Sequence, residues 1–328
     1  MAKTSLLQER IVYKPFEYQQ ASDYWLKQQQ AHWLHTEVPM MSDVNDWKQN
    51  LTDSEKNIIG SILKGFAQTE TVVNDYWSTL VTSWFRKPEV IKMAVTFGAF
   101  ETIHAEAYSL LNEELGLDNF SEFLEDEATM AKIEALTTVR DSHDGTPNWH
   151  ERAKSLAVFS AFTEGVNLFS SFAVLLSFKL NNKLKGVGQI VEWSIRDESL
   201  HSEAGCWLFR TLMREHPEFN TPELKADIEE AAKLSLQLEL DFIDKVFEMG
   251  DLAGCPKYDL VSFIKHRVNT KMSDLGYEAI IDGIDLEAVK RMKWFDSLSG
   301  GKQHTDFFAN RVTNYSKGVQ NWDADSLF

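Results

Sequence analysis

Four long stretches of this chain place a carboxylic acid inside an apolar helical stripe. Apolar residues recur in each stretch at spacings of three and four, which is typical of a helix that faces a core. Where the stripe should continue with another apolar side chain, each stretch has a glutamate: Glu70, Glu101, Glu164 and Glu198. A buried carboxylate without a partner costs on the order of several kcal/mol or takes up a proton. Four of them in one core therefore require a strongly positive group among them.

Two of these acids are followed by a histidine three residues later. Glu101 precedes His104 and Glu198 precedes His201, and this spacing puts each pair on one helix face. One such pair alone would indicate only a solvated face. Two pairs and two lone acids, in the order Glu, Glu-x-x-His, Glu, Glu-x-x-His, are typical of dimetal carboxylate bundles, and oxygen and imidazole ligands suit iron or manganese. We therefore predict a dinuclear metal centre. Its predicted ligands are Glu70, Glu101, His104, Glu164, Glu198 and His201.

The rest of the chain also favours helices. Glycine (16) and proline (7) are scarce among the 328 residues. Thr52 and Glu55 form a capping-box pattern, Pro88 suits a first helical turn, and Gly116 follows the last turn of that helix. Further helical patterns cover about 150–182, 187–214, 222–248 and 258–281. We predict an all-α fold, a ferritin-like helical bundle with the dinuclear site in its core.

The predicted bundle occupies residues 51–300. Residues 1–50 look irregular and form an N-terminal segment that leads into the bundle. Residues 301–328 have no helical stripe and are expected to form a flexible, acidic C-terminal tail.

Charge and cysteine content narrow the class of protein. The net charge is −17, and such a surface repels phosphate backbones, so we expect no nucleic-acid partner. Cys206 and Cys255 lie far apart without CxxC spacing, which argues against a disulfide framework and fits a reducing cytosol. No signal peptide is visible, and the longest apolar stretch, "LFSSFAVLLSF", is too short to span a bilayer. We expect a soluble cytoplasmic protein without membrane contact.

Several motifs resemble one known family. "ETIHAEAY" and "IRDESLH" look like the metal-binding motifs of the small, radical-generating subunit of class I ribonucleotide reductase. "EGVNLFSSF" resembles the third ligand helix of that subunit, and "HWLHTEVPMMSD" resembles its N-terminal segment with a buried tryptophan. The resemblance extends from about Trp33 to the tail, so it covers nearly the whole chain.

The resemblance implies roles for residues around the predicted metal ligands. It places the radical tyrosine on Tyr108, the buried tryptophan on Trp33, the acid bonded to a ligand histidine on Asp197, and the mobile C-terminal tyrosine on Tyr315. It further implies a homodimer whose last residues, "DADSLF", dock on the large subunit of a ribonucleoside-diphosphate reductase. In that family the dimetal centre activates an oxygen species and stores a radical or oxidising equivalent. The large subunit then uses it to start reduction of ribonucleotides to deoxyribonucleotides.

With Glu70 as the first ligand, the sequence does not decide which two metals the centre binds. The common diiron, tyrosyl-radical members of the family have Asp as first ligand, whereas Glu resembles the manganese-iron and dimanganese subgroups. Manganese-iron members usually lack the tyrosine, yet Tyr108 is present. The centre is therefore Fe/Fe, Mn/Fe or Mn/Mn, and the radical lies on Tyr108 or the oxidising equivalent stays on the metals. Whether an activating flavoprotein takes part is equally open.

Two other functions compete with this prediction. The first is a stand-alone dimetal-carboxylate oxidase or hydroxylase, which would need its own substrate pocket and no tail. The second is an iron store, which would accumulate many metal ions per chain. The cysteines favour a reductase subunit that works with a partner, since ribose reduction needs a thiyl radical and a dithiol. Cys206 and Cys255 do not offer such a set.

Overall fold

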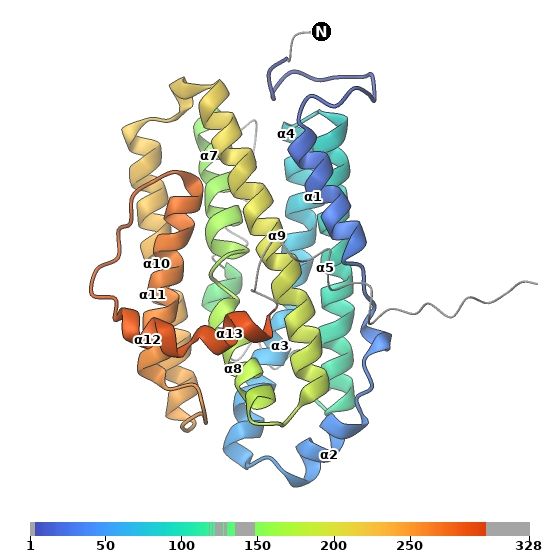
Figure 1. Cartoon of the computed structure of the whole chain (residues 1–328), viewed down its shortest axis with the longest axis vertical. Helices are drawn as coiled ribbons and strands as arrows, with labels where there is room; N and C mark the ends of the chain where they lie inside the picture. Colours follow the sequence, from blue (N-terminus) through green and yellow to red (C-terminus); the bar gives the residue numbers. More distant parts are fainter. Residues whose placement is uncertain are drawn as a thin grey trace, which may run out of the picture.

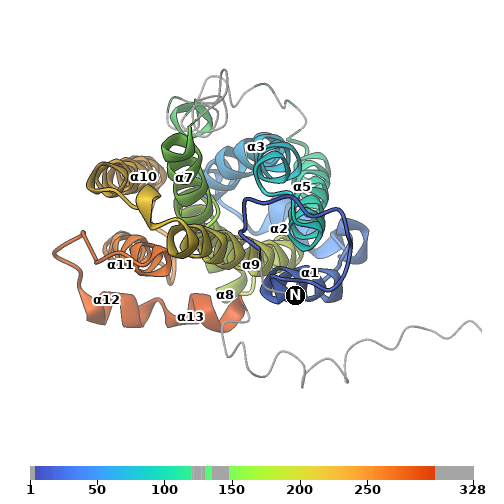
Figure 2. The ribbon, with the colours of Figure 1, turned by 90° about the horizontal axis from the view of Figure 1, so that it is seen from above.

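The computed structural model describes residues 4–117, 119, 121, 127, 130–134 and 148–299, and every regular element among them is a helix. The long helices run side by side along the molecule (Figure 1) and surround a common core when seen from above (Figure 2). The prediction of an all-α bundle is confirmed. No helix in these residues is both long and apolar enough to cross a membrane.

Four helical segments form the centre of the bundle. Two of these helices begin where the sequence predicts. The Thr52 side chain caps the helix that starts at Asp53, and the Glu55 side chain accepts a hydrogen bond from the Thr52 amide. Pro88 is the first residue of the next long helix. The carboxylate of Asp43 accepts hydrogen bonds from the amides of Gly186 and Val187 at the start of the last. The segments are α3 (Asp53–Asp75), α5 (Pro88–Glu114), α7 (Trp149–Val158) continued by α8 (Phe169–Leu180), and α9 (Lys185–Glu215).

Further helices cover this centre. α10 packs against α7 and α11, and α11 packs against α9, while α12 and α13 lie across the outside of the long helices (Figure 1). α11 ends earlier than the predicted 281, because Gly276 adopts a left-handed φ of +93°. Their bounds are Pro222–Glu248 for α10, Lys257–Leu275 for α11, Leu286–Arg291 for α12 and Lys293–Leu298 for α13.

The helix predicted over 150–182 is interrupted at its middle. α7 ends at Val158, a π-helical turn covers Phe159–Thr163, and α8 begins only at Phe169. The Glu164 amide donates to the Phe159 carbonyl (3.0 Å), five residues back, as in a π turn. A single π turn hardly changes the spacing of apolar residues along the sequence, so the sequence pattern did not reveal the interruption.

The prediction that residues 1–50 are irregular was wrong. They contain α1 (Gln19–Gln30), which packs along α5 and α9 (Figure 2), and α2 (Met41–Gln49), which supports the start of α9. α1 has the sequence QQASDYWLKQQQ, and its buried face includes Ala21, Ser22, Tyr24 and Gln28. A helix that buries so many polar or small residues has no clear apolar stripe, and this explains the miss.

Candidate metal centre

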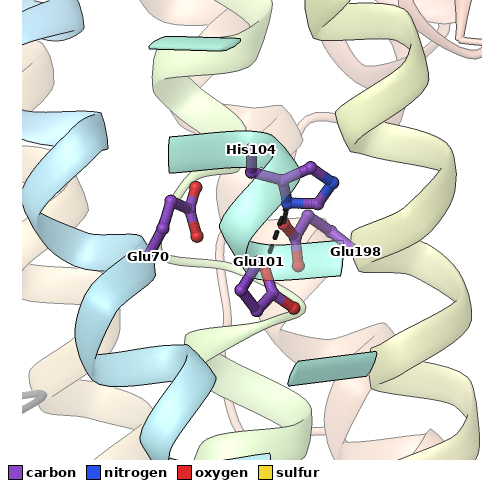
Figure 3. A group of neighbouring side chains, drawn as sticks. All are labelled: Glu70, Glu101, His104 and Glu198. Carbon is purple, nitrogen blue, oxygen red and sulfur yellow. Dashed lines mark hydrogen bonds and ion pairs between the residues drawn. The ribbon is translucent and has the colours of Figure 1, made fainter. Parts of the chain in front are cut away.

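The four central segments bring all six predicted ligands together. α3 carries Glu70, α5 carries Glu101 and His104, Glu164 directly follows the π turn, and α9 carries Glu198 and His201. All six side chains are buried. Figure 3 shows Glu70, Glu101, His104 and Glu198 converging from three helices on one interior space.

The six residues form two overlapping groups. The first group is Glu70, Glu101, His104 and Glu198, and the second is Glu101, Glu164, Glu198 and His201; within each, one ligand atom per residue lies within 4.8 Å of the others. Glu101 and Glu198 belong to both groups. A carboxylate has two oxygens, so each of these two can serve both groups at once. The arrangement offers two adjacent metal positions joined by two carboxylates.

Several buried ligand atoms lack any hydrogen-bond partner among the described residues. They include both oxygens of Glu70 and of Glu198. His201 Nδ1 and Glu101 Oε1 lie 2.8 Å apart, yet neither makes a hydrogen bond. Buried polar atoms are rarely left without partners, so lone pairs that face one space point to a cation. Two divalent ions would balance the four carboxylates, and the oxygen and imidazole donors suit iron or manganese. The residues fit a dinuclear centre.

Without a cation, protons must take its place. Burial, and then the charge of Glu198, raise the pKa of Glu70 and of Glu164 well above the usual range. Burial opposes charge on His201 as well, but Glu101 and Glu198 outweigh it and raise the pKa of His201 to about 9. Metal ligands must be deprotonated, so metal binding here releases protons.

Asp197 and Trp33 lie on the outer side of His104. Trp33 Nε1 donates a hydrogen bond to Asp197 Oδ2 (2.7 Å), and His104 Nε2 lies 3.2 Å from the same oxygen. The indole of Trp33 also stacks on the His104 ring at 5.8 Å between centroids. Although burial opposes ionisation, the hydrogen bond from His104 and the charge of Arg196 lower the pKa of Asp197. A hydrogen bond from His104 Nε2–H to an ionised Asp197 would leave the lone pair of Nδ1 available to a metal ion.

Tyr108 lies one turn beyond His104 and is fully buried. Its ring centroid is 6.5 Å from that of His104 and 4.8 Å from that of Phe66. Its hydroxyl has no hydrogen-bond partner by geometry among the described residues, although Ser194 lies close enough to influence it. Burial and the charge of Glu70 raise the pKa of Tyr108 well above its usual value. The phenol is therefore protonated and shielded from water. Tyr315, by contrast, lies outside the described residues.

Sequence reasoning missed two side chains that contact the ligands. Trp77 donates its indole N–H to Glu164 Oε1. Gln28 on α1 contacts both Asp197 and His201. The apolar pattern places Trp77 in the core but does not show where its nitrogen points. Gln28 gives no signal at all, since buried glutamine looks like surface glutamine in a sequence.

Comparison with known proteins identifies the family of this chain. The family model "Ribonucleotide reductase, small chain" matches residues 10–284. A probable ribonucleoside-diphosphate reductase small subunit of Invertebrate iridescent virus 6 is 33% identical, over 95% of this chain and 95% of its own length. A putative class I ribonucleotide reductase from Bacillus halodurans has a similar fold, with a TM-score of 0.77 at 22% identity over 85% of this chain and 99% of that one. The dimanganese(II)-NrdF of Streptococcus sanguinis gives 0.74 at 20% identity over 88% and 99%.

The fold and the buried carboxylate–histidine cluster define a ferritin-like dimetal-carboxylate protein. Within that class, the chain belongs to the small-chain family of ribonucleotide reductase. It is a small subunit, so it works together with a large subunit, and the stand-alone oxidase is not favoured.

Proposed function

We propose that this chain generates an oxidising equivalent at a dinuclear centre and delivers it to the large subunit of a class I ribonucleotide reductase. The observation that carries the proposal is the pair of overlapping ligand groups, joined through His104 to Asp197 and Trp33. The six ligands of the proposal are Glu70, Glu101, His104, Glu164, Glu198 and His201. The bound metal pair, iron, manganese or both, would supply the redox chemistry that turns an oxygen species into an oxidant.

The surrounding residues have roles that follow from their contacts. Asp197 orients His104 by accepting a hydrogen bond from its Nε2–H, as carboxylates beside ligand imidazoles generally do. The Trp77 indole fixes Glu164 on the other side of the centre. Burial keeps water away from Tyr108, because water would quench an oxidised phenol.

Trp33 is the proposed first step of the path outward. Its ring contacts those of His104 and Trp193. The Trp33 and Trp193 centroids are 5.1 Å apart, and Trp193 is partly exposed. When the indole is oxidised, its Nε1 proton can move along the 2.7 Å hydrogen bond to Asp197. The path would continue through Tyr315 in the tail, which we propose as the residue that meets the large subunit.

One cavity beside α3, next to Phe66, is too small for an organic substrate. The cavity holds only about 30 Å³ and is lined by Ser61, Phe66, Thr69 and Asn167, among others. Sites for small organic molecules have roughly ten times that volume or more. This cavity has room for a molecule of the size of water or oxygen.

The assembly is part of the same proposal. We propose a homodimer that binds the large subunit through residues 301–328, and a nucleoside diphosphate as the substrate of the complex. The names of the curated relatives, ribonucleoside-diphosphate reductase small subunits, support the choice of diphosphate. An activating flavoprotein is a further candidate partner. A monomer in sedimentation at micromolar concentration would reject the dimer.

Replacing Tyr108 by Phe separates the two places where the oxidising equivalent can be stored. The change removes one buried hydroxyl that has no hydrogen-bond partner by geometry, so fold and metal binding are expected to be retained. If the phenol holds the radical, Tyr108→Phe loses both the sharp tyrosyl signal in electron paramagnetic resonance and turnover with the large subunit. If the metals hold it, the variant keeps most of its turnover and its metal-centred spectrum.

The matched control is Tyr258→Phe, which removes an exposed phenol hydroxyl from α11. It is expected to behave as the wild type in both measurements. Both storage modes require that the wild-type protein supports nucleotide reduction by the large subunit. A wild type that binds its metals and the large subunit but supports no reduction would contradict the proposed function itself.

A further inference from the structure

Gln28 is a fully buried amide that touches the outer sides of both halves of the candidate centre. It lies on α1, outside the four segments that carry the ligands. Its Nε2 donates a hydrogen bond to Asp197 Oδ1 (3.0 Å), and its Oε1 lies 3.1 Å from His201 Nε2. Asp197 in turn contacts His104. One amide thus closes a chain of hydrogen bonds from one histidine to the other.

The hydrogen bond to Asp197 fixes which way the amide points. Carboxylate oxygens only accept hydrogen bonds, so the NH₂ end of Gln28 must face Asp197. The carbonyl end then faces His201, and a carbonyl also only accepts. His201 must therefore carry its proton on Nε2 when neutral, which leaves the lone pair of Nδ1 for a metal ion. The reversed amide would set two oxygens against each other and draw the proton of His201 to Nδ1.

We infer that Gln28 is a positioning residue that lets Asp197 preset both ligand histidines. Asp197 acts on His104 directly and on His201 through the amide. The inference rests on the proposed ligand set and adds to it a residue from α1. It also gives that helix a role in the centre: α1 carries the group that ties the two metal positions together.

Manganese(II) titration of the anaerobic protein tests the inference. Gln28→Met keeps the length of the side chain but removes both hydrogen bonds. We expect it to weaken one of the two manganese sites by about 10- to 100-fold, the usual effect of removing a partner of a ligand histidine, and to leave the other nearer its wild-type affinity. A glutamic acid side chain can keep both hydrogen bonds only when it is protonated, which burial beside Asp197 favours, so Gln28→Glu is expected to restore part of the loss. Gln29→Met, at an exposed neighbouring position, is the control and should bind as the wild type.

A second measurement uses only the wild-type protein, so its result does not depend on whether the variants fold. In zinc-loaded wild-type protein with ¹⁵N-labelled histidine, long-range ¹H–¹⁵N spectra should show the proton of His201 on Nε2. A proton on Nδ1 would overturn the inference, and so would two unchanged manganese sites in Gln28→Met. Equal losses in Gln28→Met and Gln28→Glu would indicate mere packing and also overturn it. A wild type that binds no metal would contradict the ligand set, and the inference would fail with it.

Discussion

Glu101→Ala is expected to lose both metal ions, not one. Glu101 belongs to both ligand groups, and its two oxygens face both histidines: Oε2 lies 3.0 Å from His104 Nδ1 and Oε1 lies 2.8 Å from His201 Nδ1. Removing the carboxylate takes one donor from each position and one of the four charges that offset the cations. Elemental analysis after dialysis against metal-free buffer should find metal close to zero, where the wild type retains its ions.

Glu106→Ala provides the control for this variant. Glu106 lies on the same helix, is exposed and belongs to neither ligand group. It should retain the full metal content. Circular dichroism of both variants shows whether the helices are intact, since a loss of metal through unfolding would not be informative. Full binding by a folded Glu101→Ala protein would refute the assignment of a shared carboxylate.

Deletion of residues 321–328, "NWDADSLF", is expected to reduce turnover with the large subunit to background while metal content stays normal. The proposal places docking in this acidic segment with its terminal phenylalanine, far along the chain from every proposed ligand. The truncated protein should therefore still form its metal centre but no longer reach its partner. Nucleotide reduction and metal content, measured on the same preparation, check the two halves of this expectation.

A peptide gives the matched control for the deletion. Free "NWDADSLF" should compete with the full-length chain and inhibit reduction, whereas a scrambled peptide of equal composition should not. Undiminished turnover by the truncated chain would place the docking site elsewhere.

The acids of the candidate centre could be predicted from sequence because they break a strong pattern. Each one occupies a stripe position in a segment whose sequence predicts a helix and whose other stripe residues are mostly apolar, such as Phe66 before Glu70 and Phe97 before Glu101. Helical spacing alone then brings each histidine to the same face as its acid. Burying a charge costs free energy, so an acid at a core position of a helix is unusual and easy to recognise in the sequence.

Other features could not be predicted, because they leave the apolar pattern unchanged or never enter it. The π turn before Glu164 shifts the backbone without altering which residues are apolar. Gln28 and Trp77 reach the ligands through the direction of a single polar atom, which depends on packing between distant segments. α1 buries polar and small residues, so its helix gave no stripe to find.

Metal analysis of protein purified from its native source, combined with electron paramagnetic resonance, tests the central claim most directly. The account predicts about two iron or manganese ions per chain, close enough for their spins to couple, since both ligand groups share Glu101 and Glu198. One ion per chain, two ions without magnetic coupling, or a large excess of iron would each contradict a dinuclear centre built from these six residues.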